Sequence, residues 1–189
     1  MSKIRTFIAI EIPTHIKDEI ADLQERLKGI GGKISWTKPG NIHLTLKFLG
    51  DTDEEIIDEI AAGIQQAVQN LTGFEIRVAG TGTFPNFNRP RVIWVGAKSE
   101  GEQLQELAAQ IEACVEKFGF KKEGRRFSSH LTLGRVKDAR GIQPVMDKLK
   151  SHQDFEAGVF VANEFFLIKS ELHPSGAIYT QLKKINLKI

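Results

Sequence analysis

The chain has 189 residues, of which 41% are hydrophobic and 26% are charged, and its formal net charge is +2 at pH 7. This composition is typical of one globular domain that can bury a core without disulfides or a structural metal. The slightly basic balance is compatible with a phosphate ligand but does not by itself indicate one.

The cysteine content and the hydropathy pattern point to a protein of the reducing cytoplasm. The single cysteine, Cys114, has no partner for an internal disulfide and falls in a helical pattern, so we expect a small core residue. The N-terminus lacks the apolar run and cleavage site of a signal peptide. No apolar run approaches the ~18 residues of a membrane span. We therefore expect a cytoplasmic protein with no membrane partner.

The first half of the chain predicts five elements in order. A strand over residues 5–10 precedes a helix that stops at Gly29. A His-Leu-Thr-Leu strand follows at residues 43–46. The segment Thr52–Glu55 resembles a capping box that opens the next helix, and an alternating strand begins at residue 74.

The second half repeats this order. A strand over residues 91–96 precedes a helix that stops at Gly119, and His-Leu-Thr-Leu returns at residues 130–133. A helix starts near Pro144, and residues 155–159 form the closing strand, with a Phe-Glu start that matches residues 74 and 75.

The repetition indicates an internal duplication, of approximately residues 5–84 and 91–185, within one two-lobed domain of residues 1–189. Further strands are expected at 164–170 and 178–185. The predicted fold is mixed α/β, or α+β. It has two pseudo-twofold-related lobes of antiparallel sheet, flanked by helices around a central cleft.

Side chains alternate between the two faces of a strand, so the first motif has two distinct sides. Leu44, Leu46 and Phe48 are predicted to point into the core. His43 and Thr45 are predicted to face the cleft.

The second motif repeats this arrangement, with His130 and Thr132 toward the cleft. Lys47 shares the parity of His43 and is a candidate substrate contact. Arg135 has the opposite parity, and reaches the cleft only if Gly134 permits a β-bulge. Arginine suits phosphate, so Arg135 is a second candidate contact.

Two histidines facing one volume favour acid–base chemistry on a phosphate. With an unperturbed pKa near ~6.5, one imidazole can be neutral and accept a proton from water while the other donates one to a leaving alkoxide. The threonine hydroxyls can donate hydrogen bonds to non-bridging phosphate oxygens. This set suits hydrolysis of a phosphodiester, most readily a strained cyclic one, without a metal or other cofactor.

Other chemistries find less support in the sequence. The remaining histidines, His15, His152 and His173, have no metal-ligand spacing and are expected at the surface. The chain contains no Walker A sequence, dinucleotide fingerprint or Gly-x-Ser-x-Gly elbow.

Aromatic and basic residues near the predicted cleft are candidates for RNA contact. Bases can stack on aromatic rings, and a basic loop can meet the RNA backbone. The main candidates are Trp36, Phe127 and Arg126. The wider set comprises Phe84, Phe87, Arg89, Arg91, Lys121, Lys122 and Arg125.

Several longer blocks of the chain resemble the bacterial and archaeal RNA 2',3'-cyclic phosphodiesterases, formerly called 2'-5' RNA ligases, of the two-histidine phosphoesterase superfamily. The blocks are RTFIAIEIP, WTKPGNIHLTLKFLG, GTFPNFNRPRVIWVG, FSSHLTLGRV and SELHPSGAIYTQL. They span nearly the whole chain, in the order of the family.

The resemblance implies the bilobal fold and hydrolysis of an RNA 2',3'-cyclic phosphate to a 2'-phosphomonoester. It implies that His43 is the proton donor and His130 the proton acceptor, roles that the symmetric motifs alone do not distinguish. The expected partner is RNA with a cyclic phosphate end, tRNA fragments included, and the expected state is a monomer.

Three alternatives remain open at this point. The same site could serve ATP-independent, reversible 2'-5' ligation of RNA, or hydrolysis of a small cyclic nucleotide. A third reading is an RNA-end-binding module that keeps the cleft without catalysis.

Overall fold

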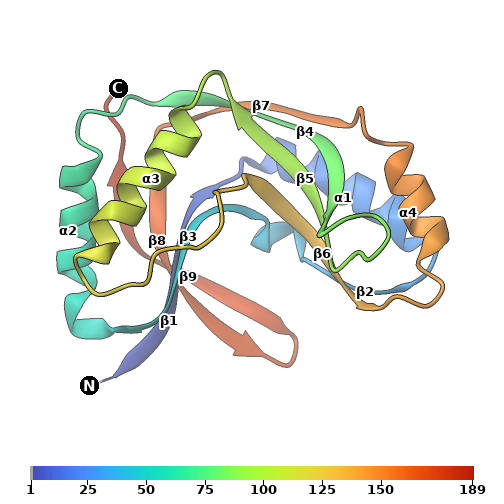
Figure 1. The fold of residues 1–189 in the computed structure, drawn as a ribbon, viewed down its shortest axis with the longest axis horizontal. Helices are drawn as coiled ribbons and strands as arrows, with labels where there is room; N and C mark the ends of the chain where they lie inside the picture. The colour runs from blue at the N-terminus through green and yellow to red at the C-terminus, as the bar shows by residue number, and fades with distance from the viewer. Residues whose placement is uncertain (1) are drawn as a thin grey trace.

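The structure, a computed structural model, describes residues 2–189, which form four α-helices and one antiparallel sheet of nine strands (Figure 1). The helices are α1 (Thr14–Lys28), α2 (Ile57–Ala67), α3 (Gln103–Glu116) and α4 (Gln143–Lys150). The strands are β1 (Lys3–Glu11), β2 (Lys33–Trp36), β3 (His43–Asp53), β4 (Phe74–Phe84), β5 (Val92–Ser99), β6 (His130–Asp138), β7 (Glu156–Ala162), β8 (Glu164–His173) and β9 (Gly176–Asn186).

The two motif strands are neighbours in the middle of the sheet. The strand order is β7-β4-β5-β6-β3-β1-β8-β9, and β2 pairs with β6 beside this path. Each repeat follows the predicted order of strand, helix, motif strand, helix and strand. The predicted mixed fold with an antiparallel sheet is confirmed.

The spatial halves of the sheet do not coincide with the sequence repeats. Strand β4 closes the first repeat, yet it pairs with β5 and with β7 in the half that contains β6. The two strands with similar Phe-Glu starts, β4 and β7, therefore pair directly, and their antiparallel register puts those starts at opposite ends of the pair. The half with β1 and β3 is completed by β8 and β9 from the end of the chain.

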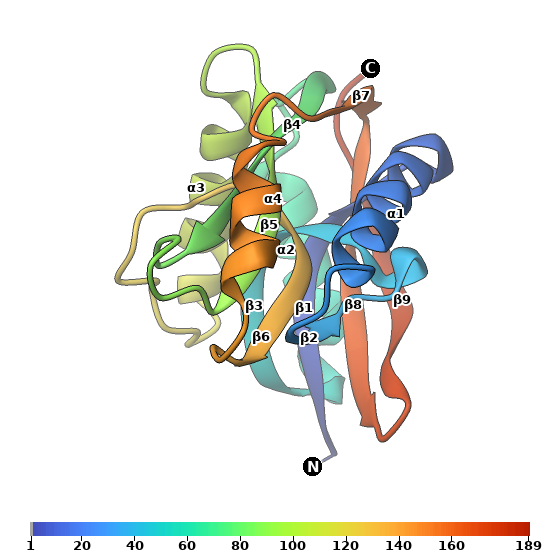
Figure 2. The same cartoon turned by 90° about the vertical axis from the view of Figure 1, so that its right-hand side faces the viewer.

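The helices gather in two pairs at opposite ends of the molecule. Helices α2 and α3 pack together at one end, and α1 and α4 pack together at the other (Figures 1 and 2). Their apolar faces share one core with the motif leucines, and Cys114 is buried there as expected. No helix within residues 2–189 is long and apolar enough to cross a bilayer.

Each motif strand contains a β-bulge at its second leucine. In β3 the pairing with β1 shifts around Leu46, because Thr45 is opposite Ala9 whereas Lys47 is opposite Ile8. In β6 the pairing with β5 shifts around Leu133 in the same way. A bulge inserts one extra residue, so the residues beyond it change faces.

The bulge in β3 overturns the parity predicted for Lys47 and Phe48. Lys47 is buried at 4% exposure, on the core side, whereas Phe48 is exposed at 55%. In β6 the bulge places Gly134 on the buried side and leaves Arg135 exposed, which confirms the predicted role of a bulge in turning Arg135.

The predicted capping box at Thr52 is wrong. Strand β3 continues to Asp53 through its pairing with β1, a 3-10 turn follows, and α2 begins at Ile57. Thr52 is buried, and its hydroxyl bonds to that of Thr6 at 2.8 Å. The Thr52 hydroxyl, predicted to cap a helix, therefore takes part in a hydrogen bond between β3 and β1.

Gly134 offers a test of the packing behind the second bulge. A methyl group on Gly134 would lie 2.8 Å from Cγ2 of Ile34 and 3.0 Å from the Trp36 ring, both in β2. We expect Gly134→Ala to lower the free energy of unfolding by about 1–3 kcal/mol through overpacking. Urea denaturation measures the change. The control is Gly124→Ala, where the added methyl group has open space, and equal stability of the two variants would contradict the prediction.

Candidate active site

The pairing of β3 with β6 sets the two motifs against each other. Leu44 lies opposite Leu131 in an antiparallel pair. In that register His43 lies across from Thr132, and Thr45 lies across from His130. The leucines are fully buried, whereas the histidines and threonines are half-buried. Each histidine thus has the threonine of the other motif as its cross-strand neighbour.

His43 is held by one hydrogen bond and two aromatic rings. Its Nδ1 lies 2.8 Å from the carbonyl oxygen of Asn41, so Nδ1 carries the hydrogen and donates. The Phe7 ring centroid lies 4.7 Å from the imidazole centroid, and Tyr179 approaches edge-on at 5.3 Å. The Nε2 atom remains for a ligand.

His130 repeats this arrangement in the other half of the sheet. Its Nδ1 donates to the carbonyl oxygen of Ser128 at 2.7 Å, again two residues before the histidine. Phe84 stands perpendicular to the imidazole with the ring centroids 4.8 Å apart. Both histidines therefore adopt the same tautomer, with Nε2 as the free nitrogen.

The threonine hydroxyls of the motifs are available to a ligand. Neither Thr45 nor Thr132 makes a side-chain hydrogen bond to any part of the chain from residue 2 onward. Two imidazoles and two hydroxyls thus converge on the centre of the sheet. Such groups can bind a phosphate and exchange protons with it.

Burial lowers the pKa of both motif histidines. For His43, desolvation outweighs the hydrogen bond to Asn41, and the positive charges of Lys17 and His130 lower the pKa further. For His130, desolvation outweighs the hydrogen bond to Ser128, and Arg135 acts in the same direction as desolvation. In both imidazoles burial therefore favours the neutral form.

Two cavities share lining residues near the first motif, and only the smaller one is lined by a motif histidine, His43. A cavity of about 110 Å³ contains His43 and Tyr179. A larger one, of about 320 Å³, contains Trp36 and Arg135. Asn41 and Tyr179 line both. The structure therefore places Trp36 and Arg135 in a cavity next to the one that His43 lines, with Asn41 and Tyr179 between them.

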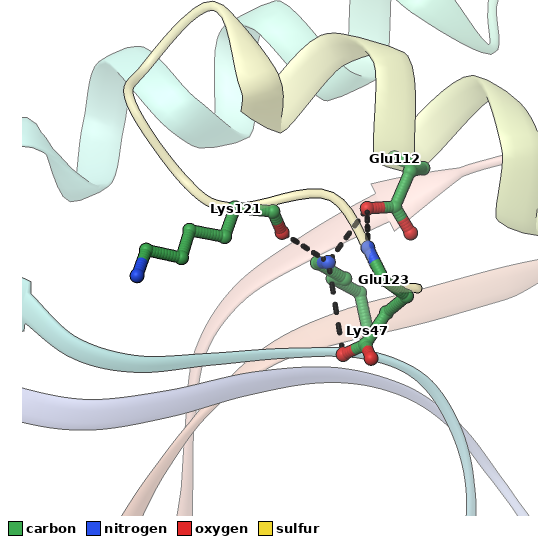
Figure 3. Close-up of polar contacts among 4 residues, drawn as sticks. All are labelled: Lys47, Glu112, Lys121 and Glu123. Carbon is green, nitrogen blue, oxygen red and sulfur yellow. Dashed lines mark hydrogen bonds and ion pairs between the residues drawn. The ribbon is translucent and has the colours of Figure 1, made fainter. Parts of the chain in front are cut away.

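The other predicted contacts lie elsewhere. Lys47 points away from the histidines and pairs with Glu112 of α3 (Figure 3). Arg126 and Phe127 line a groove between α3 and the loop before β6, with a volume of about 410 Å³. That groove contains neither motif histidine. The predicted orientation of Lys47 is wrong, and the β-bulge at Leu46 is the reason.

Some residues around the histidines escape the sequence reasoning. Phe7 and Tyr179 pack on His43, but their strands come from the two ends of the chain. The carbonyl groups of Asn41 and Ser128 are main-chain groups, so no side-chain pattern could reveal them. Their equal spacing from the two histidines is the only signal in the sequence.

The described chain, residues 2–189, contains no group of three or more histidine, cysteine or carboxylate side chains placed to hold a metal ion. His15 and His173 are exposed and His152 is half-buried.

Comparison with known proteins identifies relatives over the full length. Residues 12–174 match the family model described as the 2'-5' RNA ligase superfamily. A Methanocaldococcus jannaschii protein named RNA 2',3'-cyclic phosphodiesterase is 40% identical over 181 residues, covering 96% of this chain and 99% of its own. One of the same name from Methanothermobacter thermautotrophicus is 32% identical over 185 residues, covering 98% and 100%.

Solved structures share the fold. A crystal structure from Thermus thermophilus superimposes with a TM-score of 0.81 at 29% identity, covering 98% of each chain. Escherichia coli LigT complexed with 3'-AMP superimposes with a TM-score of 0.79 at 24% identity, covering 98% of this chain and 99% of that one. These likenesses show that the chain shares its mixed fold with those proteins.

The lowered histidine pKa values predict a loss of stability in mild acid. Below the unfolded-state pKa of about 6.5, the unfolded chain binds protons that the folded chain does not yet accept. The free energy of unfolding therefore falls as the pH drops from about 6.5 toward the folded-state values. Urea denaturation at several pH values measures this slope. We expect His43→Asn/His130→Asn to flatten it and the exposed-site control His15→Asn to leave it unchanged, and an unaltered slope in the double variant would contradict the assignment.

Proposed function

Because the chain belongs to the 2'-5' RNA ligase superfamily, we propose that its two histidines hydrolyse an RNA 2',3'-cyclic phosphodiester to a 2'-phosphomonoester. The relatives named RNA 2',3'-cyclic phosphodiesterase support the reaction. The observation that carries the proposal is the matched pair of imidazoles, each oriented by a main-chain carbonyl and each with Nε2 free. The chain acts as an enzyme, a phosphoric diester hydrolase.

The reaction divides the proton transfers between the two histidines. His130 accepts a proton from water as the water oxygen attacks phosphorus. The bond from phosphorus to the 3' oxygen breaks, and His43 donates its proton to that oxygen. The phosphate stays on the 2' oxygen, and the two histidines exchange protonation states, which solvent restores. The resemblance to the family supplies this assignment of donor and acceptor.

The neighbouring side chains are proposed to bind the phosphate and the sugar. Thr45 and Thr132 donate hydrogen bonds to the non-bridging oxygens, where negative charge accumulates in the transition state. Arg135 adds a positive charge at the mouth of the cleft. Trp36, in the same cavity as Arg135, offers an apolar face to a base or ribose. Arg126 and Phe127 are proposed to contact RNA further from the phosphate.

We propose that catalysis needs no metal and that the single domain of residues 1–189 acts as a monomer on RNA ends, tRNA fragments included. The anion itself raises the pKa of the imidazole that must be protonated, because opposite charge favours the charged form. Full turnover of a cyclic-phosphate RNA in EDTA supports this view. Turnover that is lost in EDTA and restored by one divalent cation would contradict it.

The first test removes each imidazole. His43→Ala and His130→Ala are each expected to lower turnover of an oligoribonucleotide with a 2',3'-cyclic phosphate end by at least about 10²–10⁴-fold. Circular dichroism verifies that the fold persists, and His15→Ala is the matched control. Full activity of either motif variant would exclude the two-histidine mechanism. Mass analysis shows the gain of one water, and chromatography against 2'- and 3'-phosphorylated standards tells the two isomeric products apart.

The second test removes only the threonine hydroxyls. Thr45→Val and Thr132→Val keep the shape of the side chain and are each expected to lower kcat by about 100-fold, the usual effect of losing one transition-state donor. Steady-state kinetics measure kcat and KM separately. A rise in KM with unchanged kcat would instead indicate ground-state binding of the phosphate.

The family description also names ligation, and the same two proton transfers would join RNA ends if a 5'-hydroxyl replaced water as the nucleophile. His130 would accept the proton of that hydroxyl, and His43 would donate to the leaving 3' oxygen. Incubating both RNA halves with the enzyme, without ATP, tests this reaction. Accumulation of a 2'-5' linked product in preference to the monoester would make ligation the main reaction.

A further inference from the structure

Lys47 is a buried lysine that the proposed chemistry leaves without a role. The β-bulge at Leu46 turns it under β3, where its side chain is 2% exposed. Its Nζ donates to Oε1 of Glu112 at 2.7 Å and to the carbonyl oxygen of Lys121 at 2.8 Å, and Oε1 of Glu123 lies at 3.8 Å (Figure 3). The ammonium group of Lys47 therefore has two hydrogen-bond acceptors and a second carboxylate nearby.

The partners of Lys47 tie one loop to the core. Residues 119–129 run from the end of α3 to His130 and lie outside any helix or strand. Lys121 and Glu123 belong to this loop, and the amide of Glu123 donates to Oε1 of Glu112 at 2.9 Å. One carboxylate oxygen of Glu112 thus receives both the lysine and the loop backbone (Figure 3).

The same loop carries four basic side chains within six residues. Its exposed basic side chains are Lys121, Lys122, Arg125 and Arg126. They stand immediately before the second motif, so an RNA chain whose end lies at His130 would pass close to them. Basic side chains in that position suit the phosphate backbone.

The corresponding segment before the first motif is held in a different way. Strand β2 occupies that place and forms backbone hydrogen bonds with β6. Gln24, the counterpart of Glu112 in the repeat, is fully buried and donates to the carbonyl oxygens of Thr37 and Leu133, both at 2.8 Å. Neutral amide bonds and a strand therefore fix one segment, whereas the 119–129 loop depends on a buried charge.

Apart from the Lys47 contacts, the loop is held mainly at its two ends. Phe120 packs against the core and its amide donates to the carbonyl oxygen of Val115 at 3.3 Å, and Phe127 packs against the core near the other end. Between these ends, a groove of about 410 Å³ lies between the loop and α3. The last part is anchored independently, because the amide of Ala97 in β5 donates to the carbonyl oxygen of Ser129. Lys47 thus holds residues 121–123, while β5 holds the end next to His130.

We infer that Lys47 is a positioning residue for the RNA chain of the substrate, acting through the 119–129 loop without contacting the substrate. This inference rests on the proposed function and extends it from the cyclic phosphate to the nucleotides that precede it. Loss of the lysine releases residues 121–123 of the loop from the core and weakens binding of a polynucleotide substrate. The proton transfers at the cyclic phosphate persist, because the anchor at Ser129 does not involve Lys47.

The test compares Lys47→Met with the wild type on two substrates, an oligoribonucleotide ending in a 2',3'-cyclic phosphate and a 2',3'-cyclic mononucleotide. We expect KM for the oligonucleotide to rise about tenfold, as loss of a charged hydrogen bond allows, while kcat on both substrates changes less than about threefold. Limited trypsin digestion reads the loop directly, since its four basic residues are cleavage sites. Cleavage there is expected to be about tenfold faster in the variant.

Lys28→Met is the matched control, because it removes an exposed lysine that pairs with Glu25 on α1. It should leave the digestion rate and both KM values unchanged. If Lys47→Met does not fold, Lys47→Met/Glu112→Gln carries the test, since removing both charges leaves no unpaired ion in the core.

Each outcome decides between the alternatives. Faster digestion with a higher KM for the oligonucleotide alone supports the inference. Unchanged digestion, faster digestion with an unchanged KM, or an equal loss of kcat on both substrates overturns it. Absence of turnover in the wild type would refute the proposed function instead, and the digestion rate would still show whether Lys47 holds the loop.

Discussion

The contact of Leu44 with Leu131 is the constraint from which the rest of the site follows. It joins the two halves of the sheet between β3 and β6, and it lies at the centre of the duplicated motifs. Because both leucines are buried, the strand pair cannot slip by one residue without turning its apolar side chains toward solvent. The register that protects the core therefore also places each histidine opposite a threonine.

Much of this arrangement could be predicted from the sequence. The helices and strands follow from apolar periodicity, and the repeat of His-Leu-Thr-Leu indicates two equivalent strands. Parity correctly assigns His43 and Thr45 to one face and Leu44 to the other. These predictions succeed because a strand alternates regularly until something interrupts it.

The failures have one cause, which is that a β-bulge leaves no clear mark in a sequence. The β-bulge at Leu46 exchanges the faces of Lys47 and Phe48. The β-bulge at Leu133 could be predicted only because a glycine, Gly134, follows it. The capping signal at Thr52 fails for a related reason, since cross-strand pairing with β1 extends the strand through it. Local sequence patterns do not reveal features that depend on pairing with a strand distant in the sequence.

The two halves of the site have the same reacting groups but differ in what supports the segment that precedes each histidine. Both imidazoles are anchored in the same way, but a strand supports the approach to one of them and a charged cluster supports the approach to the other. A duplication that keeps the reacting groups identical can thus still specialise its two sides.

The anchoring of the imidazoles by main-chain carbonyls also affects how the site tolerates mutation. In many enzymes a carboxylate orients the histidine, and one substitution removes it. Here the acceptors belong to positions 41 and 128, which already hold different side chains, Asn41 and Ser128. Substitution there changes the side chain and leaves the acceptor in place, so the orientation of the imidazoles is inherited with the backbone path. The hydrogen bond that orients each imidazole is thereby independent of the side chain at either position.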